Sequence, residues 1–180
     1  LGLPDAIVKA IANDDYDRGL SDITVTQLLD PPRKVVLVAR HADEIVEDAS
    51  DRIYSLMGQA IHTVLERANV ADSVEERLYA PVLGWQVGGK YDNLSLIPDA
   101  EYGHILSDYK NVSVWEVING LKPERHAQLN ILGWLARRHG YRVDRLEAVC
   151  IIRDWSKRKA RTEENYPKKQ VMRYFVPTWP

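Results

Sequence analysis

An acidic residue and a lysine near the middle of the sequence have the types and the spacing of a hydrolytic centre. Asp108 and Lys110 are separated by a single residue within the segment 104–110, which has the composition of a β-strand. Alternate residues of a strand share a face, so the carboxylate and the ammonium are expected side by side. Such a pair is by itself more often a plain ion pair. Further acids must converge on it before chemistry is indicated.

Asp92 is a candidate for the second acid, because it ends the preceding predicted strand, 86–92, after a pair of glycines where another backbone can approach closely. If these two strands pair as neighbours, Asp92 and Asp108 converge, and two carboxylates held together repel each other strongly. A fold tolerates this mainly when a cation lies between them, and oxygen ligands of this kind suit Mg²⁺ or Mn²⁺. Lys110 would then position or activate a water and offset charge on a phosphate.

Two further polar residues are candidates for the same site. Glu76, on the first strand of this region, would be a third acid, and a solvated acid at a strand edge is an equal interpretation. Gln128 falls on the predicted helix 123–139, where steps of about 100° place it among apolar side chains. The polar face opposite contains His126, Asn130 and Arg137. A buried amide needs partners, so Gln128 either caps a core backbone group or holds Lys110 or a metal-bound water.

Periodicity indicates the elements that position these residues. Residues 51–68 form the clearest helix, with one apolar stripe and with His62 and Glu66 on the opposite, polar face. The other expected elements are a short helix at 5–13, an entry strand or cap with a short helix at 22–29, a hairpin of strands 77–83 and 86–92, a strand at 104–110, a helix at 123–139, and strands at 146–152 and 171–176. This order predicts one mixed α/β domain over residues 1–180.

Composition limits the function classes. The net charge of −2 argues against a generic nucleic-acid binder, but a basic segment begins at about residue 153 and contains Lys157, Arg158, Lys159 and Arg161. These residues either contact phosphates or belong to a solvated loop. The single cysteine, Cys150, lies in an apolar run and reads as a buried small residue. One cysteine excludes an internal disulfide and an iron–sulfur cluster held by several cysteines.

No segment of the sequence has the features of a membrane span, a secretory signal or a nucleotide-binding loop. Apolar runs stay short of the ~20 residues that a membrane helix needs. The glycine-rich Lys-Ser/Thr phosphate loop is absent, so no nucleotide cofactor is expected. We therefore expect an intracellular, cytoplasmic protein without membrane partners.

The ordered set of these residues resembles the RecB-like branch of the PD-(D/E)XK nucleases. The set consists of Gly58-x-x-x-His62, Gly89-x-x-Asp92, Asp108-Tyr109-Lys110 and Gln128 in a helix. Thr24-Val25-Thr26-Gln27-Leu28-Leu29 followed by Pro32-Arg33 also resembles that branch, and Arg153-Asp154-Trp155-Ser156-Lys157 looks like its phage-encoded members. The resemblance runs from about residue 24 to residue 176, and the ordered set is more specific than the Asp-x-Lys pair alone.

The resemblance implies a fold, a reaction and a role for each residue. The fold would be restriction-endonuclease-like, with a central mixed β-sheet flanked by helices 51–68 and 123–139. The metal, Mg²⁺ or Mn²⁺, would be bound by His62, Asp92, Asp108 and the backbone carbonyl of Tyr109. Lys110 would be the catalytic lysine, Gln128 would match the glutamine of the downstream helix motif, and Glu66 would assist. Leu132 stands where that motif often has an aromatic residue, which puts the handling of DNA ends in doubt.

The implied function is a metal-dependent DNA nuclease that hydrolyses phosphodiester bonds. An exonuclease in replication, recombination or repair, of a phage type, is the first choice within the class, and an endonuclease is its nearest alternative. The rival from another class is a catalytically silent DNA-binding or structural module on the same fold. Retention of Asp92, Asp108, Lys110 and Gln128 disfavours that rival.

Overall fold

The computed structural model describes residues 2–13, 18–68, 73–74, 76–98 and 103–179. Its helices are α1 (Asp5–Ala12), α2 (Val25–Leu29), α3 (Pro32–Arg40), the 3₁₀ helix η1 (Ala49–Arg52), α4 (Ile53–Ala68), α5 (Val114–Ile118), α6 (Pro123–Arg138) and α7 (Lys157–Thr162). Its strands are β1 (Ile23–Thr24), β2 (Ser73–Val74), β3 (Arg77–Val82), β4 (Trp85–Lys90), β5 (Asn93–Leu96), β6 (His104–Val112), β7 (Val143–Ile152) and β8 (Val171–Val176).

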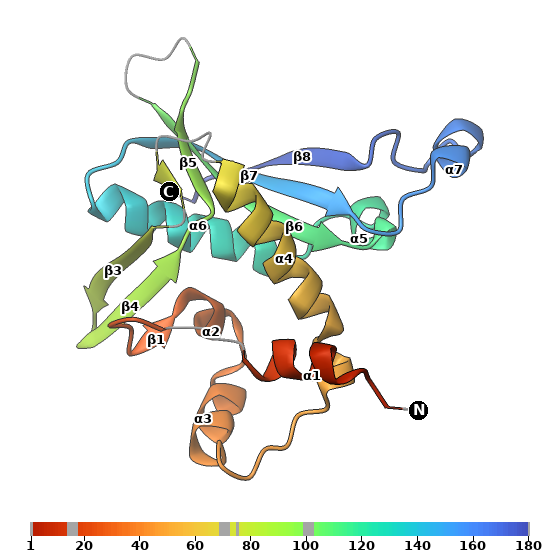
Figure 1. Cartoon of the computed structure of the whole chain (residues 1–180). Helices are drawn as coiled ribbons and strands as arrows, with labels where there is room; N and C mark the ends of the chain where they lie inside the picture. Colours follow the sequence, from red (N-terminus) through yellow and green to blue (C-terminus); the bar gives the residue numbers. More distant parts are fainter. Residues whose placement is uncertain (1, 14–17, 69–72, 75, 99–102, 180) are drawn as a thin grey trace.

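The strands form two sheets. The larger has the order β2-β5-β6-β7-β8, in which β6 and β7 are parallel and the other pairs are antiparallel. The smaller has the order β1-β4-β3, with β1 parallel to β4 and β3 paired to β4 in a hairpin. Figure 1 shows α4 crossing in front of α6 and β6. The predicted α/β class, with mixed β-structure flanked by helices, is confirmed.

Strands 86–92 and 104–110 are not neighbours, so the condition on which the convergence of Asp92 and Asp108 depended is not met. The first of these strands ends at Lys90, and a further strand, β5, follows within the segment that the sequence indicated as a loop. β5 is the one that pairs with β6, while β4 belongs to the smaller sheet. The break comes at Tyr91-Asp92, where the chain passes from one sheet to the other.

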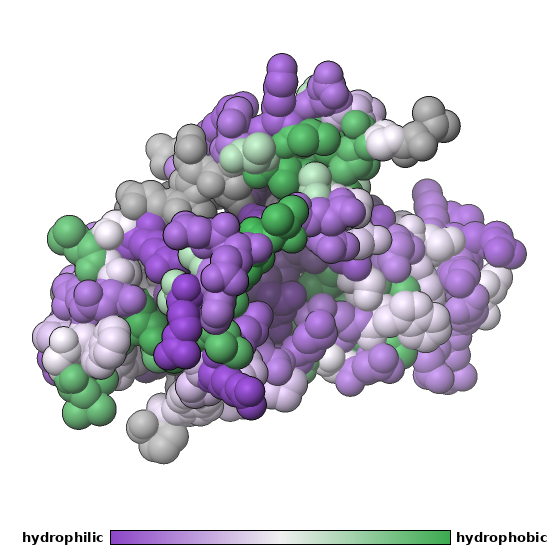
Figure 2. All heavy atoms as spheres, turned by 90° about the horizontal axis from the view of Figure 1, so that it is seen from below, coloured by the Kyte–Doolittle hydropathy of each residue, from purple (hydrophilic) through white to green (hydrophobic). Residues whose placement is uncertain are grey.

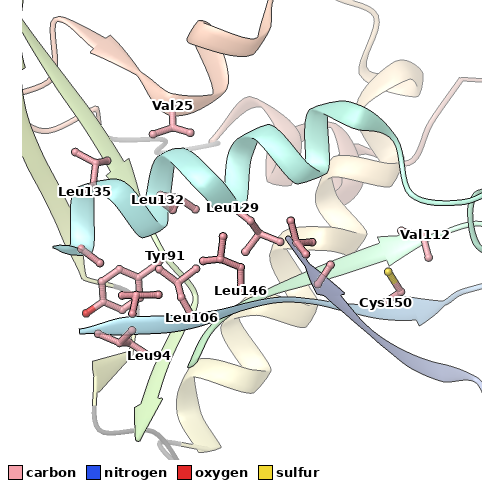
Figure 3. Close-up of a cluster of buried hydrophobic side chains, with 14 of the residues drawn as sticks. Val25, Tyr91, Leu94, Leu106, Val112, Leu129, Leu132, Leu135, Leu146 and Cys150 are labelled. Atoms are coloured by element: carbon pink, nitrogen blue, oxygen red, sulfur yellow. The ribbon is translucent and has the colours of Figure 1, made fainter. Parts of the chain in front are cut away.

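Helix α6 lies at the centre of the hydrophobic core. Figure 3 shows Leu129 and Leu132 of this helix between it and the strands that carry Leu106 and Leu146. Pro123 occupies its first turn, and Gly140, at a φ of +89°, follows its end, as the sequence predicts. The expectation that Asn130 is on a polar face is wrong. Its side chain is buried and bonds to the carbonyls of His126 and Pro177 and to the amide of Trp179.

Cys150 lies inside this core, as its apolar surroundings predict. Its side chain is fully buried, and desolvation raises the pKa of the thiol to about 11. Such a thiol carries almost no thiolate at neutral pH, so it is a packing residue and not a nucleophile.

The N-terminal helices are less deeply packed than the core. Helix α4 has no buried residue, although Ile53, Leu56, Ile61 and Leu65 of its apolar stripe are half-buried. Figure 2, which views the molecule from below, shows apolar side chains among hydrophilic ones and a hollow near the centre of that face. Within the described residues, no helix is long and apolar enough to span a membrane.

Candidate active site

Asp92 lies at the crossing between the two sheets, one residue before β5. The register of β5 with β6 places Asn93 opposite Ser107, so the antiparallel pairing ends where Asp92 begins. The Asp92 carboxylate takes over beyond that point, since its Oδ2 accepts a hydrogen bond from the amide of Tyr109 at 2.6 Å. The Asp92 carboxylate therefore supplies the hydrogen-bond acceptor that a continuation of β5 would have offered to Tyr109.

The backbone carbonyl of Tyr109 faces the same side as its amide. In a β-strand the N–H and C=O of one residue point toward the same neighbour, as the paired bonds of an antiparallel ladder require. Because the amide bonds to Asp92, the carbonyl oxygen is directed past the end of β5 as well. The Tyr109 side chain projects to the face of the sheet opposite Asp108 and Lys110. There its hydroxyl accepts a hydrogen bond from Asn93 Nδ2 at 3.2 Å.

Asp108 and Lys110 form the second part of the site. The two alternate on β6, and Lys110 Nζ lies 2.8 Å from the Asp108 carboxylate. Asp108 is only 3% exposed, so its charge depends on this ammonium for compensation. The predicted side-by-side geometry is observed. The pair is deep in the sheet, whereas an ion pair on a surface would be solvated.

His62 approaches Asp92 from helix α4. Its Nδ1 lies 3.4 Å from Asp92 Oδ1, and both side chains are partly shielded from solvent. Helix α4 packs against β6, which brings its polar face toward the crossing between the sheets. Asp92 thus joins His62 of a helix to Tyr109 of a strand, although the three residues are far apart in sequence.

A groove of about 490 Å³ opens beside Asp92 and His62. Helices α2, α4 and α6, strands β1 and β4 and the link from β4 to β5 line it. The lining residues are Thr24, Val25, Thr26, Gln59, His62, Thr63, Glu66, Gly88, Gly89, Lys90, Asp92, Gln128 and Leu132. Gln128 is half-buried and lines the groove. Its contact with Lys110 or a metal-bound water stays a prediction. Asp108 and Lys110 do not line the groove. Tyr109, which lies between them in sequence, is hydrogen-bonded to Asp92, which does line it.

The glycine at position 89 is required for this arrangement. A Cβ added there would lie 2.6 Å from the side chains of both Leu132 and Val25. Glycine therefore lets α6 and α2 pack directly on the backbone of β4, as the sequence suggests for this pair of glycines.

Glu76 is placed apart from these residues. Its side chain accepts hydrogen bonds from the hydroxyls of Tyr91 at 2.8 Å and Tyr141 at 3.2 Å, and it does not line the groove. Burial raises the pKa of Tyr141, and the neighbouring charge of Glu76 raises it further. The structure thus shows Glu76 holding two tyrosines where the strands meet.

Four of the basic residues of the C-terminal segment lie on α7. Lys157, Arg158, Lys159 and Arg161 are exposed on this helix, so the segment is not simply a loop. Figure 1 shows α7 at the end of the molecule beyond the C-terminal end of β7, on the same side as α5. The structure does not bring these residues to the groove.

The donors around Asp92 suit a divalent metal by their chemistry, but they do not form a closed cluster. Across the described ranges, no three His, Cys, Asp or Glu side chains are close enough to hold an ion. His62, Asp92 and the backbone of Tyr109 do lie together, and the carboxylate and carbonyl oxygens among them are ligands that Mg²⁺ and Mn²⁺ accept.

Lys90 is a groove residue that the sequence reasoning missed. It is exposed at the end of β4 and lines the groove with Asp92. Its position two residues before Asp92 could have indicated it, because Asp108 and Lys110 are separated by the same spacing. Thr24 and Thr26 also line the groove, and Thr24 caps α2 in a reciprocal pair of bonds with Gln27.

Neither a protein-family model nor a curated protein matches this sequence. Solved structures do match its fold. The crystal structure of SSO0001 is similar over 96% of this chain and 75% of that one, at 17% identity and a TM-score of 0.65. The crystal structure of an alkaline exonuclease (LHK-Exo) from Laribacter hongkongensis matches 96% of this chain and 82% of that one, at 14% identity and a TM-score of 0.48. The likeness to SSO0001 shows a shared fold.

Proposed function

We propose that this chain is a metal-dependent DNA nuclease that hydrolyses phosphodiester bonds. One observation carries the proposal: Asp92 links His62 of α4 to Tyr109 of β6, next to the buried Asp108–Lys110 pair. Residues that the sequence pattern grouped by resemblance to the PD-(D/E)XK nucleases are thereby close together in space. The alternating strand residues and the groove that adjoins them support the same assignment.

The proposed metal is Mg²⁺ or Mn²⁺. His62, Asp92, Asp108 and the Tyr109 carbonyl would hold it, and it would supply a more acidic water and compensate charge on a phosphate. Neither a nucleotide cofactor nor an iron–sulfur cluster has a part in the proposal. Glu66 lines the groove one turn after His62 and would assist by orienting water or a ligand.

The protein's own residues would do the rest. Lys110 would offset charge on the scissile phosphate or position the attacking water, since its ammonium is already fixed by Asp108. The side-chain amide of Gln128 would hold a water or phosphate oxygen from the opposite wall of the groove. Lys90, at the same wall as Asp92, would bind a neighbouring phosphate.

Within this class we favour an exonuclease in DNA replication, recombination or repair, because the ordered motif resembles the exonuclease branch. An endonuclease of the same superfamily is the nearest alternative. The protein would act inside the cell, in the host cytoplasm if it is phage-encoded. Its partner is DNA, and nothing at the site requires a membrane.

The deciding experiment is digestion of linear and covalently closed circular DNA, single- and double-stranded, with Mg²⁺, Mn²⁺ or EDTA. We expect cleavage with metal, loss of cleavage in EDTA, and digestion of linear DNA only. Cutting of closed circles would indicate an endonuclease. The control is Asp108→Asn, which should be inactive. If wild type binds DNA but never cleaves it with either metal, the chain is a silent DNA-binding module and the proposal is wrong.

A further inference from the structure

A second pocket, separate from the groove, lies between α5 and α7. Its volume is about 330 Å³, within the range of small-ligand sites, and its wall includes Trp115, Ile118 and Tyr166. Trp115 is 63% exposed and Ile118 is 38% exposed, so a large aromatic face is open to solvent. The roles proposed above do not use this pocket.

The pocket is held in a fixed shape by hydrogen bonds in and next to its wall. The Tyr166 ring is buried, and its hydroxyl accepts a hydrogen bond from the amide of Ser156 at 2.8 Å. Asp154 Oδ1 accepts the amide of Val114 at 2.7 Å, which fixes the start of α5 to the chain after β7. Trp155 Nε1 donates to the carbonyl of Pro167 at 2.8 Å. An occupant would therefore meet a preformed surface and would lose little affinity to reordering.

The surface around the pocket is mainly basic, whereas the pocket wall also contains carboxylates. The segment 153–173 contains eight basic and three acidic residues, and most of the basic ones are exposed on α7 or next to it. The pocket wall itself combines Lys159 with the carboxylates of Asp154 and Glu163. Carboxylates repel a phosphate but accept hydrogen bonds from the amino groups of bases. The pocket thus suits a base, and the surrounding α7 surface suits the phosphates that flank it.

The pocket also lies close along the chain to the Asp108–Lys110 pair. From Lys110 the chain runs along β6 to Val114 at the pocket, about 13 Å at roughly 3.3 Å per residue. Arg153 lies between the two, with its guanidinium bonded to the Asn111 carbonyl and stacked on the Tyr54 ring at 4.4 Å. At about 3.4 Å per nucleotide, a separation of this size corresponds to roughly four nucleotides of one strand.

From these observations we propose that the α5–α7 pocket binds an unstacked base of a single-stranded DNA segment, stacked on Trp115, while α7 contacts the adjacent phosphates. The ligand class rests on the proposed nuclease function, because it takes DNA as the substrate. A flat π-surface beside a basic helix is the usual platform for single strands, and it tolerates any sequence. In a paired duplex the bases are stacked on each other, so blunt duplex DNA cannot fill the pocket.

The test is binding of the full chain in EDTA, which prevents cleavage, to fluorescein-labelled single strands and blunt duplexes followed by anisotropy. Trp115→Ala should weaken single-strand binding by about tenfold or more, the usual effect of losing a base–aromatic stack. Binding to blunt duplex should change less than about twofold, and Trp115→Phe should restore most of the loss. The matched control is Trp85→Ala, at a tryptophan of similar exposure, 59%, on the β3–β4 hairpin. It should leave both affinities unchanged.

The failure of this inference and that of the proposed function are distinguishable. If wild type cleaves DNA with metal and Trp115→Ala binds single strands normally, the pocket assignment alone is wrong. Equal weakening of single strands and duplexes also overturns it, since the ring would then act without an unstacked base. If Trp115-dependent single-strand binding occurs without any cleavage, the nuclease proposal fails and the pocket assignment survives. Absence of binding to every DNA overturns the pocket assignment.

Discussion

Asp92 accepts a hydrogen bond from the backbone amide of Tyr109 at 2.6 Å. This bond holds the segment between the two sheets against β6, the strand that carries Asp108 and Lys110. The same carboxylate has its other oxygen 3.4 Å from His62. Asp92 therefore has two separable properties: an oxygen that completes the edge of β6, and a negative charge. An asparagine at this position keeps the first and removes the second.

Asp92→Asn should fold normally and lose cleavage. Its amide oxygen can still accept from Tyr109, so the free energy of unfolding should change by about 1 kcal/mol or less. Asp92→Ala leaves that amide without the acceptor and should cost about 1–3 kcal/mol. Urea unfolding of both variants, with nuclease assays beside it, measures the two effects. Wild-type cleavage by Asp92→Asn would remove the charge from the mechanism.

Lys110 should be essential for catalysis and partly replaceable in folding. Because Asp108 is 3% exposed, complete loss of its partner would leave a buried charge. Lys110→Gln retains a donor for that carboxylate but has no positive charge. We expect cleavage to fall by at least about 10²-fold, with a smaller loss of stability than a side chain without a donor would cause. Single-turnover rates at saturating DNA give the first quantity and thermal melting the second; a rate near that of wild type excludes a catalytic role for the ammonium.

His62 should affect the response to metal. If His62 is a ligand, His62→Ala should raise the Mn²⁺ concentration for half-maximal activity by about tenfold or more. It should also reduce the Mn²⁺-induced rise in melting temperature, because an ion that binds only the folded state stabilises it by mass action. The matched control is His41→Ala, since His41 pairs with Glu44 at 3.2 Å in an exposed site away from the groove. Equal behaviour of the two variants would make His62 a structural residue.

The sequence was sufficient for the local parts of the site. The alternation of Asp108 and Lys110 follows from strand periodicity, and the orientation of His62 follows from the polar face of a helix whose stripe is clear. Both depend only on residues close in sequence. The same holds for the turn at Gly140 and the start of α6 at Pro123.

The sequence was insufficient where distant segments decide the structure. Strand β5 is only four residues long and lies close to Pro98, so its composition favoured a loop. Pairing with β6, which supplies its stability, is a tertiary effect. Asn130 looked solvent-facing because it is polar, yet the carbonyl of Pro177 and the amide of Trp179 satisfy it from 47 and 49 residues away. No helical periodicity could reveal those partners.

The basic face of α7 should contribute electrostatic binding. Reversal of Lys157, Arg158, Lys159 and Arg161 to glutamate should weaken DNA binding and flatten its salt dependence, because each lost phosphate contact reduces the slope of log affinity against log salt by about 0.7–0.9. The control reverses Arg33, Lys34 and Arg40, which are exposed on α3. An unchanged slope in the α7 variant, or an equal change in the control, would show that α7 makes no direct contact.

Glu147 is a buried charge on the opposite face of the larger sheet, and it was not anticipated from its strand. It is 1% exposed, accepts the Ser107 hydroxyl at 3.0 Å and is bonded by both Nε and Nη2 of Arg173. This bond raises the pKa of Arg173. The pair links β7 to β8, and alternation of side chains directs it away from Asp108. Its contribution should therefore be to stability and not to cleavage.

Arg173→Met should destabilise the fold, because it leaves the Glu147 carboxylate in the sheet without its cation. Loss of one member of a fully buried pair costs about 3–5 kcal/mol. The Arg173 side chain is 63% exposed and screened by water, so we expect about 1–3 kcal/mol here.

In the double variant Glu147→Met/Arg173→Met the charge is gone as well, and much of the loss should be recovered. Urea unfolding of the two single variants and the double variant gives the coupling energy, and cleavage per folded molecule should stay constant in all of them. A double variant that is less stable than either single one would show that Glu147 acts by packing alone, and reduced cleavage would connect this face of the sheet to the active site.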